Sequence, residues 1–253
     1  MHDNPTPSRP RLDQLLVDRG LFATRSRARD AVARGTVQVD GKPATKPGMS
    51  VSIDAQIVVD DPASAYVSRA ALKLIAGLDH FAIDAKGRTA LDIGASTGGF
   101  TQVLLTHGAA HVIAVDVGHD QLDQSLRDDL RITNHEGLNA RTLNASHLQG
   151  HKIDLVVSDV SFISLKLALP PALALAEPGS HCVLLVKPQF EAGREAIGKG
   201  GLLRDPAISE RVADDLAAWL GTMPGWRVLG LCPSPIEGGD GNREFLLAGI
   251  KDQ

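Results

Sequence analysis

The chain has 253 residues, of which 43% are hydrophobic and 22% are charged, and its formal net charge is -4. These values are ordinary for a folded globular protein and exclude a disordered one. The length allows one large and one small domain. Because the net charge is negative, a nucleic-acid partner can be inferred only from where the charges cluster.

The cysteines and the apolar segments limit the cellular setting. Cys182 and Cys232 lie in separate apolar runs, which excludes a disulfide framework and a structural zinc site. Met1 is followed by polar residues and a proline, so we expect no signal peptide. The longest apolar region, 165–176, contains Lys166 and two prolines and is too short to cross a bilayer. We therefore expect a soluble cytoplasmic protein with no membrane partner and no obligate protein partner.

The first sixty residues predict a small α+β domain over 11–61. Residues 1–10 are proline-rich and predict a flexible tail. Helical spacing and capping residues predict one helix from Leu12 to Gly20 and a second from Thr24 to Gly35. Alternating residues and an Asp40-Gly41 turn predict strands at Thr36–Val39, Val51–Ile53 and Ile57–Val59. A short linker over 62–66 follows.

The pattern changes over 67–253, where an amphipathic helix at Val67–Leu78 precedes a series of apolar runs. The runs predict strands at Ala90–Ile93, Val112–Val115, Ile153–Val157 and Cys182–Val186. Continuous apolar runs separated by helical stretches are typical of a parallel sheet covered on both faces. Two later strands, Trp226–Leu231 and Glu244–Ala248, are joined without a crossover helix and must be antiparallel. This α/β arrangement, mostly parallel with an antiparallel last strand, predicts a Rossmann-like methyltransferase sheet.

A glycine-rich turn between Leu91 and Phe100 follows the first of these strands. Glycines there let the backbone approach a ligand, and the next helix offers free N–H groups. The spacing fits neither a dinucleotide fingerprint nor a phosphate loop. Asp116 ends the second strand, where an acid can accept hydrogen bonds from ribose hydroxyls. We expect this turn and the nearby acids to bind a cofactor. The expected binding residues are Asp92, Gly94, Ala95, Ser96, Thr97, Gly98, Gly99, Phe100, Asp116 and Asp159.

Four further side chains are each ambiguous when they are taken singly. Asp159 follows Ile153–Val157 and could face the ligand crevice or cap a helix. Lys187 follows a buried run before a proline, which would place its ammonium in the crevice. Lys73 could lie near Lys187 or be a solvated helix lysine, and Glu244 could be functional or an edge charge that discourages strand pairing.

Five blocks in order give these residues a common meaning. They are Ser68–Leu74, Gly94–Phe100, Asp159–Ser164, Val186–Glu191 and Gly241–Phe245. The chain from Tyr66 onward thereby resembles the FtsJ-type RNA 2′-O-methyltransferases, and most closely their TlyA group, some members of which are labelled haemolysins. The resemblance implies S-adenosylmethionine as cofactor and a catalytic tetrad of Lys73, Asp159, Lys187 and Glu244. Lys187 would act on the ribose hydroxyl as a base or as an electrostatic stabiliser, and Asp159 would hold it.

The N-terminal domain is locally basic, with nine basic and four acidic residues between Arg9 and Lys46. Such a cluster supplies affinity for phosphates rather than base selectivity, although a solvated charged face is the plainer explanation. Residues 11–60 also resemble the S-four RNA-binding domain, through blocks around Arg11, Ser26 and Gly35–Lys42. We expect RNA contacts from Arg11, Arg25, Arg27, Arg29 and Lys42.

The resemblance implies a ribosomal RNA cytidine 2′-O-methyltransferase. Two departures from the family matter. The linker reads Ser64-Ala65-Tyr66-Val67 without the expected arginine, which weakens the case for linker-mediated signalling, and the chain stops just past its last strand. In the family the shorter form implies large-subunit RNA as the favoured partner. The alternatives are a non-catalytic ribosome assembly factor that retains the fold and a membrane-lytic protein. We expect no metal site, because Gly150 lies between His147 and His151 and no third ligand is near.

Overall fold

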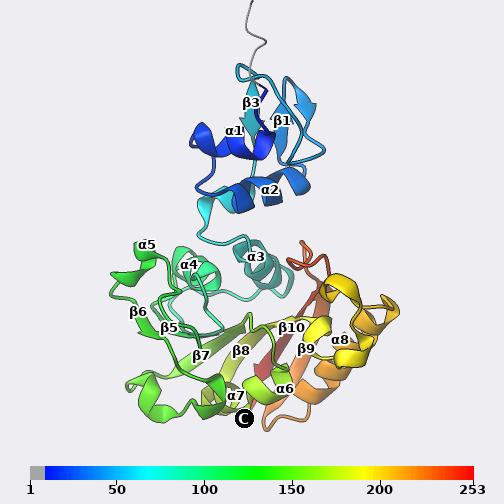
Figure 1. Cartoon of the computed structure of the whole chain (residues 1–253). Coiled ribbons are helices and arrows are strands. Elements are labelled where there is room, and N and C mark those ends of the chain that lie inside the picture. The colour runs from blue at the N-terminus through cyan, green and yellow to red at the C-terminus, as the bar shows by residue number, and fades with distance from the viewer. Residues whose placement is uncertain (1–8) are drawn as a thin grey trace, which may run out of the picture. The chain divides into compact units, whose positions relative to one another are not determined.

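The computed structural model describes residues 9–253, so nearly all of the predicted tail lies outside the described residues. The chain divides into two compact units, one that ends at Ala65 and one that spans Tyr66–Gln253. Each unit has a hydrophobic core of its own, which lets each be described separately (Figure 1).

The first unit packs two helices against a small antiparallel sheet. The helices are α1 (Leu12–Asp18) and α2 (Arg25–Ala33). The sheet has the order β2-β1-β3, with β1 at Val37–Val39, β2 at Lys42–Pro43 and β3 at Ile57–Val59. Apolar side chains from both helices and from β1 form the core of this unit.

Local signals in the sequence explain most of these elements. Thr24 caps α2 as predicted, because its Oγ1 accepts a hydrogen bond from Arg27 N at 3.3 Å. Asp40 and Gly41 have φ of 50° and 74° and form the two-residue turn between β1 and β2. The predicted strand at Val51–Ile53 is wrong. There the backbone turns, with Ala55 N bonded to Ser52 O, and Val51 is buried without joining a sheet.

The second unit is built on a seven-stranded sheet of order β6-β5-β4-β7-β8-β10-β9. The strands are β4 (Thr89–Ile93), β5 (His111–Val115), β6 (Ile132–His135), β7 (Ile153–Ser158), β8 (Ala176–Val186), β9 (Trp226–Pro233) and β10 (Phe245–Lys251). In this sheet only β10 runs opposite to the other six strands, which confirms the predicted mostly parallel sheet with an antiparallel last strand. The apolar pattern did not predict β6, because this edge strand is only partly buried.

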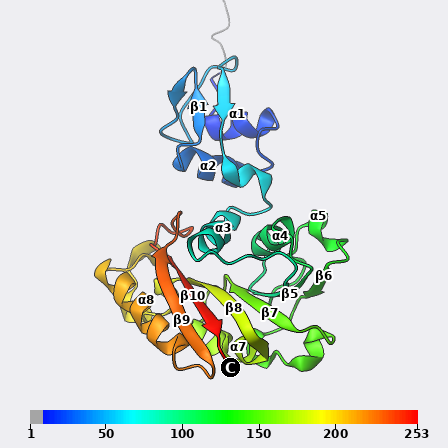
Figure 2. The ribbon, with the colours of Figure 1, turned by 180° about the vertical axis from the view of Figure 1, so that it is seen from behind.

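Helices cover both faces of this sheet (Figure 1 and Figure 2). The α-helices are α3 (Ala71–His80), α4 (Gly99–Thr106), α5 (Gln124–Arg127), α6 (Leu165–Ala168), α7 (Pro170–Leu175) and α8 (Ala207–Leu220). Short 3-10 turns lie at Pro62–Ala65, Ala140–Thr142, Ala145–Leu148, Pro188–Phe190, Arg194–Ala196 and Lys199–Gly201. The helix predicted from Val67 begins only at Ala71, because Ser68 Oγ accepts a hydrogen bond from Ala70 N and holds a turn there.

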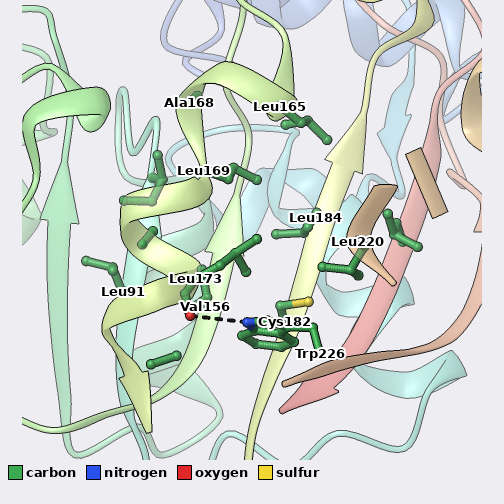
Figure 3. Close-up of a cluster of buried hydrophobic side chains, with 14 of the residues drawn as sticks. Leu91, Val156, Leu165, Ala168, Leu169, Leu173, Cys182, Leu184, Leu220 and Trp226 are labelled. Atoms are coloured by element: carbon green, nitrogen blue, oxygen red, sulfur yellow. Dashed lines mark hydrogen bonds between the residues drawn. The ribbon is translucent and has the colours of Figure 1, made fainter. Parts of the chain in front are cut away.

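The core on the α6, α7 and α8 side of the sheet is continuous and well packed (Figure 3). Leu169, Leu173 and Leu184 are completely buried in it. The indole of Trp226 closes its lower edge and donates a hydrogen bond to Leu173 O at 3.1 Å. Burying one such leucine side chain contributes about 1.5–3 kcal/mol, so this layer is a main source of stability for the unit.

Truncation of Leu169 tests this packing. Leu169→Ala should lower the free energy of unfolding by about 2–5 kcal/mol, because it removes buried methyl groups and leaves a cavity. Leu167→Ala is the matched control, since Leu167 is 60% exposed two residues away, and it should change stability by less than about 0.5 kcal/mol. Urea titrations that gave the two variants equal stability would contradict this account of the core.

Candidate active site

The pairing of the parallel strands brings three predicted residues to one edge of the sheet. Ile93, the last residue of β4, is opposite Val115 of β5 and Ser158 of β7. The residues that follow these three positions are Gly94, Asp116 and Asp159. Their N–H groups extend the ladder, with bonds to Val115 O (2.8 Å), His135 O (3.0 Å) and Ile93 O (3.0 Å), respectively. Backbone hydrogen bonds therefore fix the positions of all three.

The turn after β4 depends on a glycine for an internal reason. Gly94 has a φ of 83°, and a Cβ at this position would lie 3.0 Å from the carbonyl carbon of Asp159. A side chain would thus push apart the ends of β4 and β7. Gly98 has a φ of 93° and precedes α4, so the chain can turn directly from strand to helix.

A pocket of about 520 Å³ opens beside this turn. Its walls are mostly apolar, with Asp116 and Asp159 as its charged members; the remaining lining residues are Ile93, Gly94, Ser96, Val115, Val117, Gln121, Leu138, Asn139, Ala140, Val160, Ser161, Phe162, Ile163 and Ala168. A smaller hollow of about 60 Å³ shares Gly94, Ser96 and Asp159 with it. An apolar cavity with a few converging polar groups is the usual form of a small-molecule site.

Most of the predicted cofactor residues line one of these two spaces. Gly94, Ser96, Asp116 and Asp159 border the larger pocket, and Ala95, Thr97, Gly99 and Phe100 border the smaller hollow. Asp92 and Gly98 border neither. Asp92 is fully buried in the sheet, and Gly98 contributes through its backbone conformation.

The carboxylate of Asp116 is held in a fixed orientation. Oδ2 accepts a hydrogen bond from Ser96 N (2.8 Å), and Oδ1 accepts one from Gly118 N (2.7 Å). Each carboxylate oxygen can accept a second bond, so Asp116 keeps free acceptor sites at the pocket.

Negative charge is concentrated around the glycine turn. Burial raises the pKa of Asp92 to about 7, although a hydrogen bond from Thr101 Oγ1 (2.7 Å) opposes this rise. The charges of Asp159 and Asp116 raise the pKa of Asp92 further. Oδ1 of Asp92 is buried and accepts no hydrogen bond. A positive charge on a ligand in the pocket would offset part of the repulsion from Asp116 and Asp159, which border it.

Glu136 supports the pocket wall, a role that the sequence pattern did not reveal. Its carboxylate accepts hydrogen bonds from the N–H groups of Asp120 (2.6 Å), Gln121 (3.0 Å) and Leu122 (3.1 Å). These bonds, that from Leu122 most of all, lower the pKa of Glu136 to about 2. Recognition of β6 would have placed Glu136 at the carboxyl edge of the sheet, which was the missing signal.

Lys187 and Asp159 form an ion pair at the rim of the pocket. They follow the adjacent strands β8 and β7, and Lys187 Nζ lies 2.6 Å from Asp159 Oδ1. The same ammonium donates a hydrogen bond to Ser161 Oγ at 2.7 Å. The predicted helix-cap alternative for Asp159 is wrong, because Ser164 caps the next helix, α6. Asp159 thus connects the pocket to a lysine.

Lys73 and Glu244 form a second, more deeply buried pair. Lys73 Nζ lies 2.5 Å from Glu244 Oε2, and their side chains are 6% and 2% exposed. Lys73 is therefore buried, and the alternative of a solvated helix lysine is wrong. Glu244 precedes β10 rather than starting it, and Phe245 pairs with Val186. Glu244 and Lys187 hence leave the sheet at the same edge.

The basic residues of the first unit fall into two groups. Arg11 and Arg25 converge on the fully buried carboxylate of Asp13, at 3.1 and 3.0 Å, while their own side chains stay about half exposed. Hydrogen bonds from Arg11 first, then from Arg25, lower the pKa of Asp13 to about 2. Arg29 and Lys42 are exposed, and Arg27 donates to Ala63 O at 3.4 Å. The arginines at 11 and 25 thus have a structural task besides any contact with RNA.

Within residues 9–253, no three potential metal ligands cluster. The two histidines at 147 and 151 lie in different settings. His147 Nδ1 accepts a hydrogen bond from Asn144 N, and His151 stacks on His111 with ring centroids 4.1 Å apart.

The sheet order and the pocket at its carboxyl edge are those of a Rossmann-like methyltransferase domain, which here follows a small α+β domain. Residues 66–251 match the family model of the FtsJ-like methyltransferases, and residues 10–57 match that of the S4 domain. A solved structure described as a candidate hemolysin from Streptococcus thermophilus is 40% identical, with a TM-score of 0.74 over 97% of this chain and 90% of that one.

Similar proteins with known names indicate the group within this family to which the chain belongs. The 16S/23S rRNA (cytidine-2′-O)-methyltransferase TlyA of Mycobacterium tuberculosis is 46% identical over 94% of this chain and 89% of its own length. The 23S rRNA (cytidine-2′-O)-methyltransferase TlyA of Campylobacter jejuni is 40% identical over 74% and 72%. The chain belongs to the TlyA group of the FtsJ-like methyltransferases. Among the helices of residues 9–253, none is both long and apolar enough to cross a membrane.

A side chain added at Gly238 tests how closely the surroundings of the buried Lys73–Glu244 pair are packed. A Cβ at Gly238 would lie 2.6 Å from Glu244 Oε1, so Gly238→Ala should displace this carboxylate from Lys73. We expect the free energy of unfolding to fall by about 1–3 kcal/mol, as in other overpacked sites. Gly239→Ala is the control, because the nearest atom to its Cβ would be 3.9 Å away. Equal denaturation midpoints for the two variants would contradict the close approach of Gly238 to Glu244.

Proposed function

We propose that this chain transfers a methyl group from S-adenosylmethionine to the ribose 2′-hydroxyl of a cytidine in ribosomal RNA. The observation that carries the proposal is the ion pair of Lys187 and Asp159 at the rim of the pocket, since Asp159 borders the pocket and also contacts the lysine. The relatives named as cytidine-2′-O-methyltransferases support it.

The pocket has the chemistry that S-adenosylmethionine requires. Its apolar walls suit an adenine ring, Asp116 can accept hydrogen bonds from ribose hydroxyls, and the hollow at Gly94–Phe100 suits the methionine end. The acidic side chains that border the pocket, Asp116 and Asp159, are compatible with a cationic ligand. When bound, S-adenosylmethionine would supply a methyl group already activated by a positively charged sulfur.

Lys187 would act at the oxygen that attacks this methyl group. A ribose hydroxyl is a weak acid, so its reaction needs help in removing a proton or in stabilising the developing alkoxide. The ammonium of Lys187 lies 2.6 Å from Asp159 Oδ1 and donates a hydrogen bond to Ser161 Oγ, and another of its N–H groups would donate to the hydroxyl. The pair Lys73–Glu244 would fix the hydroxyl on the other side at the same sheet edge.

Large-subunit RNA is the substrate that we favour. The two relatives differ in that one name includes 16S RNA, whereas both names include 23S RNA. The S4 domain match and its exposed basic residues supply a surface for structured RNA. Cytidine as the methylated nucleoside also follows from both names.

Removal of the Lys187 amine is the direct test. Lys187→Ala should lower methyl transfer to large-subunit RNA by about 10²-fold or more, the usual loss when a proton-transfer group is removed. RNA affinity should stay within about twofold. The reaction is followed with labelled S-adenosylmethionine, and mass spectrometry of the RNA locates the 2′-O-methyl group.

Lys166→Ala is the matched control, because Lys166 is an exposed lysine of the same unit. It should retain full activity. Unchanged activity in Lys187→Ala would overturn the mechanism, and absence of transfer by the unaltered protein would instead favour a non-catalytic assembly factor.

The RNA surface is tested at Arg29 and Lys42, whose side chains are exposed. The double variant Arg29→Ala with Lys42→Ala should bind RNA more weakly and flatten the plot of log affinity against log salt by about 1–2, since each lost phosphate contact lowers the slope by roughly 0.7–0.9. Lys152→Ala, in the second unit, is the control. A slope equal to that of the unaltered protein would remove the S4 domain as the RNA-binding surface.

A further inference from the structure

Two segments of the candidate site contain polar and aromatic residues that the proposed reaction leaves without a role. The first segment, 159–165, follows β7, and the second, 187–191, follows β8. Asp159 and Lys187 open these segments, and their ion pair is already part of the proposed mechanism. Ser164, Phe190 and Glu191 lie farther along, and nothing in the reaction itself requires them.

Contacts between the two segments recur along their whole length. Next to the ion pair, Lys187 Nζ donates to Ser161 Oγ at 2.7 Å. Farther on, the rings of Phe162 and Phe190 are 4.9 Å apart between centroids. At the far end, Glu191 Oε2 accepts a hydrogen bond from Ser164 Oγ (2.5 Å), and Oε1 accepts one from Leu165 N (2.7 Å). We refer to these contacts together as the brace.

The brace is stiff because each segment is also bonded within itself. Phe190 N bonds to Lys187 O at 3.0 Å and Glu191 N bonds to Pro188 O at 3.1 Å, so the position of Glu191 is tied to that of Lys187. Phe162 has a φ of 65°, a conformation that a bulky side chain rarely adopts. Such a conformation persists only where the surrounding contacts impose it. The ring of Phe162 is itself 90% exposed, and the hydrogen bonds that hold the segment are those of Ser161 and Ser164 on either side of it.

Capping of a helix accounts for only one of the two hydrogen bonds of Glu191, that from Leu165 N at the start of α6. The helix that begins after Ser164, α6, has only four residues, and Ser164 Oγ already accepts a hydrogen bond from Lys166 N at 3.2 Å. The second carboxylate oxygen of Glu191 instead reaches Ser164 itself, across a separation of 27 residues in the sequence. The main effect of these bonds is therefore to fix one segment against the other.

We propose that Glu191 is a positioning residue: by closing the brace, it sets the ammonium of Lys187 against Asp159 and Ser161 and so aims it at the reacting hydroxyl. This inference rests on the proposed methyl transfer. A shift of the lysine by about 1 Å is enough to slow a reaction that depends on alignment by up to about 10²-fold. Residues 159–163 of the first segment also border the pocket, but the side chain of Glu191 bonds to Ser164 and Leu165, which do not border it. Binding of cofactor and of RNA should therefore depend less on Glu191 than kcat does.

A double-mutant cycle in methyl transfer tests the proposal with the full-length protein. Glu191→Ala should lower kcat by about 10-fold, while KM for S-adenosylmethionine and for RNA changes less than about twofold. Ser164→Ala should lower kcat in the same direction, and the double variant should be no slower than Glu191→Ala, because both changes break the same contact. Glu191→Gln keeps an acceptor for Leu165 N, and its new amide N–H can donate to Ser164 Oγ in place of the bond that the carboxylate accepts, so it should restore kcat to within about threefold.

Two further measurements separate this role from loss of folding. Thermal melting reports whether Glu191→Ala stays folded at the assay temperature. Hydrogen exchange at the Leu165 amide measures whether the bond to Glu191 is present, independently of activity. Exchange should be faster in Glu191→Ala than in the unaltered protein. It should be unchanged in Glu195→Ala, the control, because Glu195 is an exposed glutamate of the same loop. If the unaltered protein transfers no methyl group, the proposed function fails, whereas the exchange result still reports on the brace.

If the unaltered protein is active, the double-mutant cycle of Glu191 and Ser164 decides whether Glu191 is a positioning residue. Additive losses from Glu191→Ala and Ser164→Ala would overturn the proposal. So would an equal fall in kcat for Glu195→Ala, or a loss in Glu191→Ala that is confined to KM.

Discussion

Strands β7 and β8 lie side by side and run in the same direction, and the site depends on this pairing. Ser158 and Leu184 are partners in the ladder, so the chain leaves the two strands at the same edge of the sheet. Asp159, which borders the pocket, and Lys187, which would act on the substrate, are 28 positions apart in the sequence. The pairing of the strands brings Lys187 Nζ to 2.6 Å from Asp159 Oδ1. The parallel register, rather than any local motif, creates the ion pair.

Charge at this edge is balanced in pairs. Asp159 is opposed to Lys187, and Glu244 is opposed to Lys73, of which the second pair is almost completely buried. A buried ion pair seldom adds net stability, because the cost of removing both charges from water offsets their attraction. The arrangement therefore makes more sense as a device for orientation than as a stabilising contact. Stability comes mainly from the apolar layers on the two faces of the sheet.

Much of this could be predicted from the sequence because the signals were local. Apolar runs located β4, β5, β7 and β8, and the residues directly after them had to lie at the ligand edge. Strand β6 was not found, because a half-exposed edge strand leaves no apolar run. The role of Glu136, which follows β6, was therefore not predicted either, because the three backbone N–H groups that it binds precede it by 14 to 16 residues. The roles given to Lys73 and Glu244 came from family resemblance, since no pattern along the chain pairs residues that are 171 positions apart.

The close packing of Gly94 has a consequence for the comparison of related chains. What a side chain would strike at this position is the backbone of Asp159, a part of the protein itself. A relative that had lost its cofactor would still need the glycine to bring the ends of two strands together. The glycine turn is thus a marker of the fold, and by itself it cannot distinguish an active enzyme from an inactive descendant. Under the proposed mechanism Lys187 would carry that information, because the pairing of β7 with β8 does not itself require an amine there.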